Sequence, residues 1–225
     1  MVTPSDDLIE KASKSSLRRT GGGIVPAGRI IIDIGTGDGR FVYQSARLNP
    51  ERFYIGIDPS PRPLAKLSEK IHRRPEKGGL ANVLFIQAAV EDLPCELDGV
   101  ADEVHVHFPW GSLLRAVAIG DESALGGIRR ICAPDALFEV VIALDPERAG
   151  SEIARLGLDS LTGDYLESVL VPRYRAAGFE VSETGVLPYR ERPSVNTSWA
   201  ARLRDRPGRS ITYLIARAVA KRLVG

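Results

Sequence analysis

The sequence is poor in cysteine and has no long apolar stretch. Of its 225 residues only two are cysteine, Cys95 and Cys132, and they lie far apart. They offer neither a disulfide framework nor a zinc-binding pair, so a reducing cytoplasm is the simplest location. No apolar run approaches the ~18 to 20 residues that a membrane span needs. Because residues 1–19 also lack the apolar segment of a secretory signal, we expect a cytoplasmic protein without membrane attachment.

The chain also lacks a strong net charge, with a formal value of +1 at neutral pH. The charges are nevertheless unevenly distributed, because residues 62–77 and residues 190–209 each carry six basic side chains against two acidic ones. Either stretch alone is compatible with an ordinary solvated surface. Together they indicate a positive face, which suits a phosphate-rich partner.

Short apolar runs alternate with helical stretches along most of the chain. The predicted strands are 29–34, 52–57, 82–87, 102–108, 136–143, 179–186 and 210–219, and the predicted helices are 39–48, 62–73, 123–132 and 159–177. Alternation of this kind predicts parallel βαβ units, whereas the last two strands have no helix between them and are expected to pair antiparallel. The pattern therefore predicts an α/β fold in one domain, 1–225. Its sheet has seven mostly parallel strands with an antiparallel last strand, and helices cover both faces.

Two segments do not fit into this alternation. Residues 1–28 are polar and then glycine-rich, and no strand or helix is assigned to them. Residues 187–209 form a long connection between the last two strands, which we expect to be a substrate-binding loop.

A glycine-rich loop follows the first predicted strand. It reads Asp33-Ile34-Gly35-Thr36-Gly37-Asp38-Gly39. Its glycines permit positive φ and let a ligand approach the backbone closely, and the next helix presents free N–H groups to a carboxylate. Asp33 and Asp38 would repel a pyrophosphate but attract an ammonium group, and the spacing is not Gly-x-Gly-x-x-Gly. The loop therefore favours S-adenosylmethionine over a dinucleotide.

Two further strand ends complete this predicted cofactor site. Asp58-Pro59 follows the second strand, where an acid typically accepts hydrogen bonds from ribose hydroxyls. The segment after the third strand contains Val90 and Glu91, which are candidate contacts of the adenine ring. The glycine loop, Asp58 and Glu91 occur in this order, each at a strand end. Together they indicate a Rossmann-like class I methyltransferase.

The chain has two tryptophans, and both are expected at the mouth of the site. Trp110 follows Phe108-Pro109 at the end of the fourth strand, where a flat ring can stack on a planar substrate. Trp199 lies in the arginine-rich connection 187–209. Two such rings can sandwich a flipped nucleobase.

These motifs resemble the 16S ribosomal RNA (adenine-1408-N1) methyltransferases, the kanamycin–apramycin resistance family. The resemblance covers about residues 29–217 and rests on the glycine loop with Arg40, Pro75-Glu-Lys-Gly-Gly-Leu80, Glu91-Asp-Leu-Pro94, Phe108-Pro-Trp-Gly-Ser-Leu-Leu114, and Thr197-Ser-Trp199 with Arg202. The chain departs from the family at residues 1–28, where the expected N-terminal hairpin is not visible.

The resemblance implies that Trp110 and Trp199 hold a flipped adenine and that the enzyme confers aminoglycoside resistance. It implies cofactor contacts by Asp33, Asp58, Glu91 and Thr197. It also implies docking of a monomer on helix 44 of the 30S subunit through basic side chains. These are Lys66, Lys70, Arg73, Arg74, Arg202, Arg206 and Arg209.

Adenine N1 carries a free lone pair, so the predicted reaction needs positioning rather than a general base. His105 and His107 are one conceivable base or metal pair, but polar side chains on a strand face are the simpler interpretation, and no metal is expected. A tRNA (guanine-N7) methyltransferase remains an alternative, although its fuller Phe-Pro-Asp-Pro-Trp-Pro signature is missing. A non-catalytic RNA-binding protein of the same fold is a second alternative. A small-molecule methyltransferase would leave both basic stretches unexplained.

Overall fold

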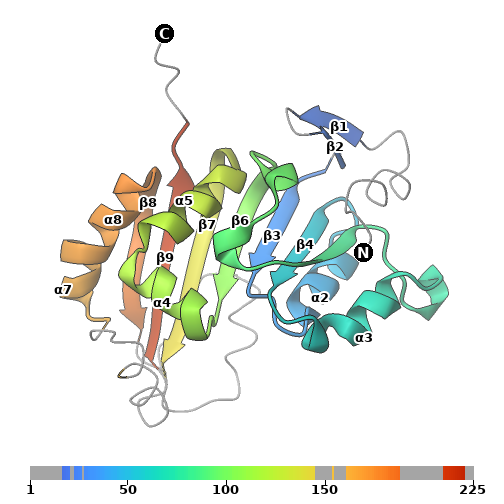
Figure 1. Ribbon diagram of the computed structural model, residues 1–225, viewed down its shortest axis with the longest axis horizontal. Coiled ribbons are helices and arrows are strands. Elements are labelled where there is room, and N and C mark those ends of the chain that lie inside the picture. The colour runs from blue at the N-terminus through green and yellow to red at the C-terminus, as the bar shows by residue number, and fades with distance from the viewer. Residues whose placement is uncertain are drawn as a thin grey trace.

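A twisted seven-stranded sheet forms the centre of the molecule in a computed structural model (Figure 1). The structure describes residues 17–20, 23–26, 28–144, 154, 161–187 and 210–220. The strand order is β5-β4-β3-β6-β7-β9-β8. The strands are β3 (Ile30–Ile34), β4 (Phe53–Asp58), β5 (Val83–Gln87), β6 (Ala101–His107), β7 (Cys132–Leu144), β8 (Phe179–Leu187) and β9 (Ser210–Ala218). Strands β3 to β7 run parallel, and β9 pairs antiparallel with both β7 and β8.

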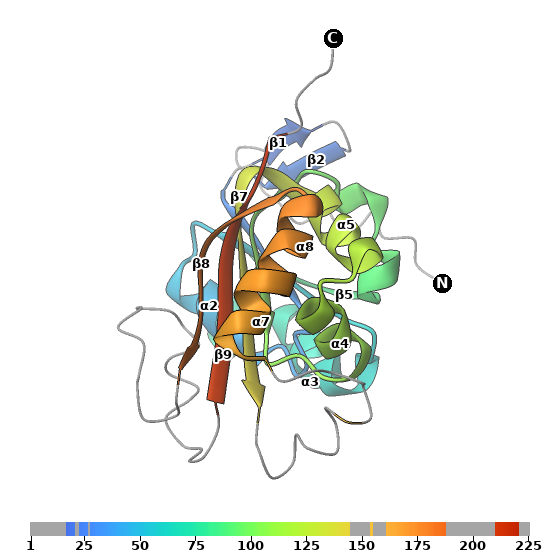
Figure 2. The same cartoon turned by 90° about the vertical axis from the view of Figure 1, so that its left-hand side faces the viewer.

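Helices cover both faces of this sheet (Figure 2). On one face, α2 (Arg40–Leu48) and α3 (Pro61–Ile71) pack against residues such as Ile31 and Tyr54. On the other face, a larger apolar core contains Ile32, Val104 and Phe138. That core is covered by α4 (Gly111–Ile119), α5 (Glu122–Ile131), α7 (Gly163–Tyr165) and α8 (Val171–Ala176), with a π-helical segment, Leu166–Leu170, between the last two. The predicted fold class, including the antiparallel last strand, is therefore confirmed.

Several local predictions need correction. An antiparallel hairpin, β1 (Leu17–Thr20) with β2 (Gly23–Pro26), lies in the N-terminal segment where the sequence showed none, so the expected departure from the family at this point is corrected. Helix α4 was not predicted, because it starts at a glycine and has no side-chain cap. The predicted helix 159–177 is interrupted by a π-helical segment, whereas its end before Gly178, whose φ is 88°, agrees with the prediction. In the described part of the chain, no helix is long and apolar enough to cross a membrane.

Phe108 lies on the opposite face of the sheet from the one that strand alternation predicts. In an extended strand over 102–108 it would share a face with Val104 and Val106, but it packs instead against Val141 and Ile211. The reason is a backbone φ of 53°, which takes Phe108 out of the extended conformation. Period-two alternation applies only while the chain remains a strand.

Candidate active site

The glycine loop links the end of β3 to the start of α2. Gly35, Gly37 and Gly39 have φ values of 74°, 60° and 72°, the left-handed conformation that glycine adopts without penalty. The backbone N–H groups of Gly35 and Thr36 donate to the carbonyl of Ile57 at 2.8 and 3.1 Å, which ties the loop to β4. A Cβ added at Gly37 would meet nothing within 4 Å. The loop is therefore rigidly held but open at its centre, which suits close approach of a ligand.

Asp58 holds the same loop from the end of β4. One carboxylate oxygen accepts a hydrogen bond from the Gly37 N–H at 2.9 Å, and the other accepts one from the Ser60 N–H at 2.8 Å. Each carboxylate oxygen has a second lone pair. The half-buried Asp58 therefore retains the capacity to accept hydrogen bonds from a pair of hydroxyl groups.

The two acids of the loop lie in different environments. Asp33 is buried with 3% of its surface exposed, whereas Asp38 is exposed and forms an ion pair with Arg40 at 3.0 Å. Thr36 is also buried, and its Oγ1 finds no hydrogen-bond partner among the described residues. A buried carboxylate, an unpaired hydroxyl and the open backbone at Gly37 together fit a ligand that carries both an ammonium and a carboxylate group.

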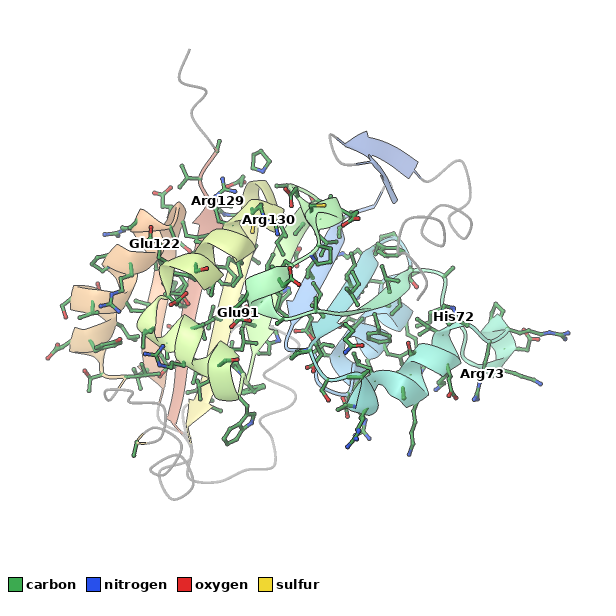
Figure 3. The ribbon with its side chains drawn as sticks, in the orientation of Figure 1. His72, Arg73, Glu91, Glu122, Arg129 and Arg130 are labelled. Atoms are coloured by element: carbon green, nitrogen blue, oxygen red, sulfur yellow. The ribbon has the colours of Figure 1, made fainter. Side chains whose placement is uncertain are left out.

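The predicted adenine-binding segment lies on the connection between β5 and β6. Val90 is buried in the core, and Glu91 is exposed near the middle of the molecule (Figure 3). Both belong to a short 3₁₀ turn, Val90–Asp92, while Pro59 is exposed beyond the end of β4. The side chain of Val90 thus serves packing, which leaves its backbone and Glu91 as ligand-facing candidates.

The Phe108–Trp110 segment lies next to the glycine loop. Phe108 N–H donates to the Val141 carbonyl at 2.7 Å, and the turn leads to Trp110, whose surface is 64% exposed. Helix α4 starts immediately afterwards, and a Cβ built on Gly35 would come within 2.5 Å of the side chain of Leu113. This contact places the first turn of α4 directly against the loop. The expectation that Trp110 is not a core residue is confirmed by its exposure.

His105, His107 and Glu139 form a buried polar cluster beneath α2. His107 Nε2 lies 2.6 Å from Glu139 Oε1, and His105 Nδ1 lies 3.3 Å from the same oxygen. Both histidine rings contact the Phe41 ring edge-on, at centroid distances of 5.8 and 5.2 Å. The histidines are thus polar residues on a strand face, as the sequence was interpreted, but that face is buried and they take part in a charged network.

The protonation of this cluster follows from its contacts. Burial opposes the charged form of His105, but hydrogen bonds to Glu103 and Glu139 outweigh it and raise the pKa to about 9. Burial also acts against the Glu139 carboxylate, yet hydrogen bonds from both histidines lower its pKa to about 2. Burial lowers the pKa of His107. His105 is thus the imidazolium of the cluster, Glu139 its carboxylate and His107 a neutral ring.

A metal ion is the other group that such residues commonly bind. The ligand atoms of His105, His107 and Glu139 lie within 4.8 Å of one another. Two ligands of a tetrahedral ion at about 2.0 to 2.1 Å would be separated by roughly 3.3 Å. The 2.6 Å separation of His107 and Glu139 is that of a charge-assisted hydrogen bond instead. Glu139 was not among the predicted residues, because its part in the cluster depends on the pairing of β6 with β7.

The predicted basic residues of the first stretch lie on and after α3. Lys66, Arg73 and Arg74 are exposed, and Lys70 is half-buried with its Nζ 4.6 Å from the centre of the Tyr43 ring. A hollow of about 440 Å³ opens beside them and is lined by Arg47, Lys70, Lys77 and the backbone of Gly78 and Gly79, among others. Arg73 lies just beyond the end of α3, well away from Glu91 (Figure 3). The remaining predicted site residues, Thr197, Trp199, Arg202, Arg206 and Arg209, lie outside the described residues.

The strand order, the glycine loop and the acid at the end of β4 define a class I, S-adenosylmethionine-dependent methyltransferase. A family model described as 16S rRNA (adenine(1408)-N(1))-methyltransferase matches residues 19–219. The chain belongs to this family.

Individual relatives agree with this assignment. An Escherichia coli 16S rRNA (adenine(1408)-N(1))-methyltransferase is 38% identical over 78% of this chain and 80% of its own length. The crystal structure of the aminoglycoside resistance methyltransferase NpmB1 matches with a TM-score of 0.73 and 50% identity, over 85% of this chain and 87% of that one. A variant 16S rRNA (adenine(1408)-N(1))-methyltransferase from Catenulisporales acidiphilia, solved with its cosubstrate SAM, has a TM-score of 0.74 and 35% identity, over 86% of this chain and 87% of that one. The guanine-N7 alternative is less supported, because a relative with that name covers only 35% of this chain.

Proposed function

We propose that this protein transfers the methyl group of S-adenosylmethionine to N1 of adenine 1408 in 16S rRNA and thereby confers aminoglycoside resistance. The observation that carries the proposal is the exposed Trp110 beside a glycine loop whose fold and sequence match an adenine-1408 methyltransferase family. When bound, S-adenosylmethionine supplies an electrophilic methyl group on a sulfonium.

Each residue of the loop has a distinct part in binding this cofactor. Asp33 would attract the ammonium, and the Thr36 hydroxyl, which has no partner among the described residues, would donate to the carboxylate at the N-terminus of α2. Asp58 accepts hydrogen bonds from the ribose hydroxyls. Glu91 and the Val90 backbone flank the adenine, next to Pro59. The first turn of α4 packs on the loop through Leu113 and would hold Trp110 beside the cofactor site.

The acceptor is bound by stacking. Trp110 provides one face of the sandwich, and we assign the other face to Trp199. Two rings would fix the orientation of the base, and N1 carries a free lone pair, so positioning by these side chains would replace general-base catalysis. The methylated adenine is positively charged, which facing indole rings tolerate through cation–π attraction.

The partner is the 30S subunit, contacted at the helix 44 decoding region by a monomer in the cytoplasm. The basic side chains on and after α3 supply contacts with RNA phosphates. Lys66, Arg73 and Arg74 are exposed and able to make such contacts. Arg202, Arg206 and Arg209 are proposed as the second part of the docking surface.

The test is incubation of the protein with 30S subunits and radiolabelled S-adenosylmethionine, followed by primer extension. A stop at adenine 1408 supports the proposal, and transfer RNA serves as the parallel substrate. Label on transfer RNA alone would favour the guanine-N7 alternative. Cofactor binding without any methylation would favour the non-catalytic RNA-binding protein.

A further inference from the structure

The backbone turn that presents Trp110 is strained. Phe108 has a φ of 53°, and apart from Asp135 it is the only non-glycine residue with a positive φ in the described part of the chain. Such a conformation is unfavourable for a side chain with a Cβ and persists only where its surroundings fix it. The contacts that fix Phe108 therefore also determine where Trp110, two residues later, is placed.

Three contacts surround the strained residue. The Phe108 N–H donates to the Val141 carbonyl of β7 at 2.7 Å, and the Phe108 ring packs against the pair Val141 and Ile211. The third contact is made by the preceding residue. His107 ends β6, pairs with Val141 in register, and directs its side chain at Glu139 on the same neighbouring strand.

The His107 side chain is fixed from two sides. Its side chain is 1% exposed, its Nε2 donates to Glu139 at 2.6 Å, and its ring meets Phe41 of the first turn of α2. Glu139 is itself held by His105 at 3.3 Å. An apolar side chain at position 107 would fill the space, but it would supply no directional bond to β7 and would leave Glu139 short of a donor.

We propose that His107, held by Glu139, is a positioning residue that fixes the Phe108 turn and thereby the orientation of the Trp110 ring. The proposal rests on the proposed function, because stacking by Trp110 is what makes its orientation matter. His107 acts in this proposal through the turn and not by contact with the base or the cofactor. Its loss should reduce turnover without weakening cofactor binding.

The experiment compares His107→Leu with His107→Gln. The glutamine amide keeps an N–H donor for Glu139, whereas leucine removes it. A matched control is Asn82→Ala, which removes half-buried hydrogen bonds to the carbonyls of Ala46 and Arg52 at 3.0 Å. Asn82 precedes β5 at the amino edge of the sheet, opposite the site, so the control loses stability without disturbing the turn.

Two readouts are measured on each variant. The first is kcat and KM for 30S subunits together with calorimetric S-adenosylmethionine affinity. The second is acrylamide quenching and fluorescence anisotropy of Trp110 in a Trp199→Phe background, where it is the single tryptophan. This second readout needs no RNA. It therefore tests the positioning role even if wild-type protein fails to methylate 30S and the proposed function falls.

We expect His107→Leu to lower kcat by about tenfold to a hundredfold, with cofactor affinity unchanged and with Trp110 more mobile and more readily quenched. His107→Gln should recover most of the turnover, and Asn82→Ala should lower only the melting temperature. Unchanged Trp110 fluorescence in His107→Leu would overturn the proposal. An equal loss of turnover in the glutamine and leucine variants would overturn it too. So would a Zn²⁺-dependent rise in melting temperature that the leucine variant abolishes, because the cluster would then be a metal site.

Discussion

The carboxylate of Asp58 is joined to the backbone N–H of Gly37 by a 2.9 Å hydrogen bond across the carboxyl edge of the sheet. The acid at the end of β4 therefore shapes the glycine loop in addition to its proposed contact with the ribose. A change at Asp58 should therefore affect both the shape of the loop and the binding of the ribose, because the Gly37 N–H loses its acceptor when the carboxylate is removed.

Asp58→Ala should weaken S-adenosylmethionine binding by about tenfold to a hundredfold, since hydrogen bonds to a charged group contribute roughly 1.5 to 3 kcal/mol. Asp58→Asn should lie between wild type and alanine, because its amide oxygen keeps one acceptor while its NH₂ faces a second donor. Calorimetric titration measures both, and Asp164→Ala on α7 is the control. Wild-type affinity in Asp58→Ala would contradict the assigned role.

The glycines of the loop should differ in what their replacement costs. Gly37→Ala places a left-handed alanine in open space, at a cost of about 1 to 2 kcal/mol. Gly39→Ala bears the same backbone cost, and its Cβ would also lie 2.6 Å from the ring of Phe85. Overpacking adds about 1 to 3 kcal/mol, so Gly39→Ala should be the less stable variant in urea unfolding. Equal stabilities would show that the Phe85 ring moves without cost.

Local sequence signals were sufficient for the cofactor loop. Glycines with acids at a strand end, and Asp58 at the next strand end, follow from strand topology and glycine conformation alone. The hairpin β1–β2 and helix α4 were missed. Residues 1–28 present no clear apolar alternation, and α4 starts at Gly111 without a capping side chain.

Contacts between side chains on neighbouring strands could not be predicted, because the sequence pattern of each strand does not show which strand pairs with it. Glu139 joins His105 and His107 only because β6 and β7 pair in parallel with His105 opposite Glu139. The sequence placed both histidines on a strand face, but the burial of that face depends on the packing of α2 against the sheet. Strand alternation places Phe108 on the wrong face of the sheet for a related reason. A positive φ at a non-glycine residue has no signature in hydrophobic periodicity.

The buried cluster should make stability depend on alkaline pH. The pKa of His105 is raised from 6.5 to about 9, so its stabilising contribution is complete below pH 6.5 and is lost as pH rises through about 9. Urea unfolding across this range should show a decline on the order of 2 kcal/mol. His105→Gln should remove that decline. The unfolding free energy of Asn82→Ala should instead fall with pH as steeply as that of wild type. Parallel curves for wild type and His105→Gln would mean that the proton is not held in this cluster.

The basic surface on and after α3 should bind RNA without affecting the cofactor. Arg73→Glu should weaken 30S binding and lower the magnitude of the slope of log K against log salt by about one, as expected for a phosphate contact. Arg175→Glu on α8 reverses the same charge on a different element. Filter binding at several salt concentrations separates the two variants. If both weaken binding equally, the effect is one of net charge and not of a docking surface.

Trp110 provides the most direct test of base stacking. Its ring is 64% exposed and contributes little to the core, so Trp110→Ala should fold normally and bind S-adenosylmethionine with wild-type affinity. Methylation should nevertheless fall by about tenfold to a hundredfold, because stacking on an aromatic ring contributes roughly 1 to 3 kcal/mol per base. Trp110→Phe keeps a smaller ring and should recover part of the rate.

Leu48→Ala is the matched control for Trp110→Ala, because Leu48 is another large, exposed apolar side chain but lies at the far end of α2. It should leave methylation unchanged, which excludes a general effect of surface hydrophobicity. Single-turnover methylation of 30S subunits with saturating cofactor isolates the chemical step from cofactor binding. Full activity of Trp110→Ala in this assay would remove the base sandwich from the mechanism, because a ring that positions the adenine cannot be dispensable when cofactor is saturating.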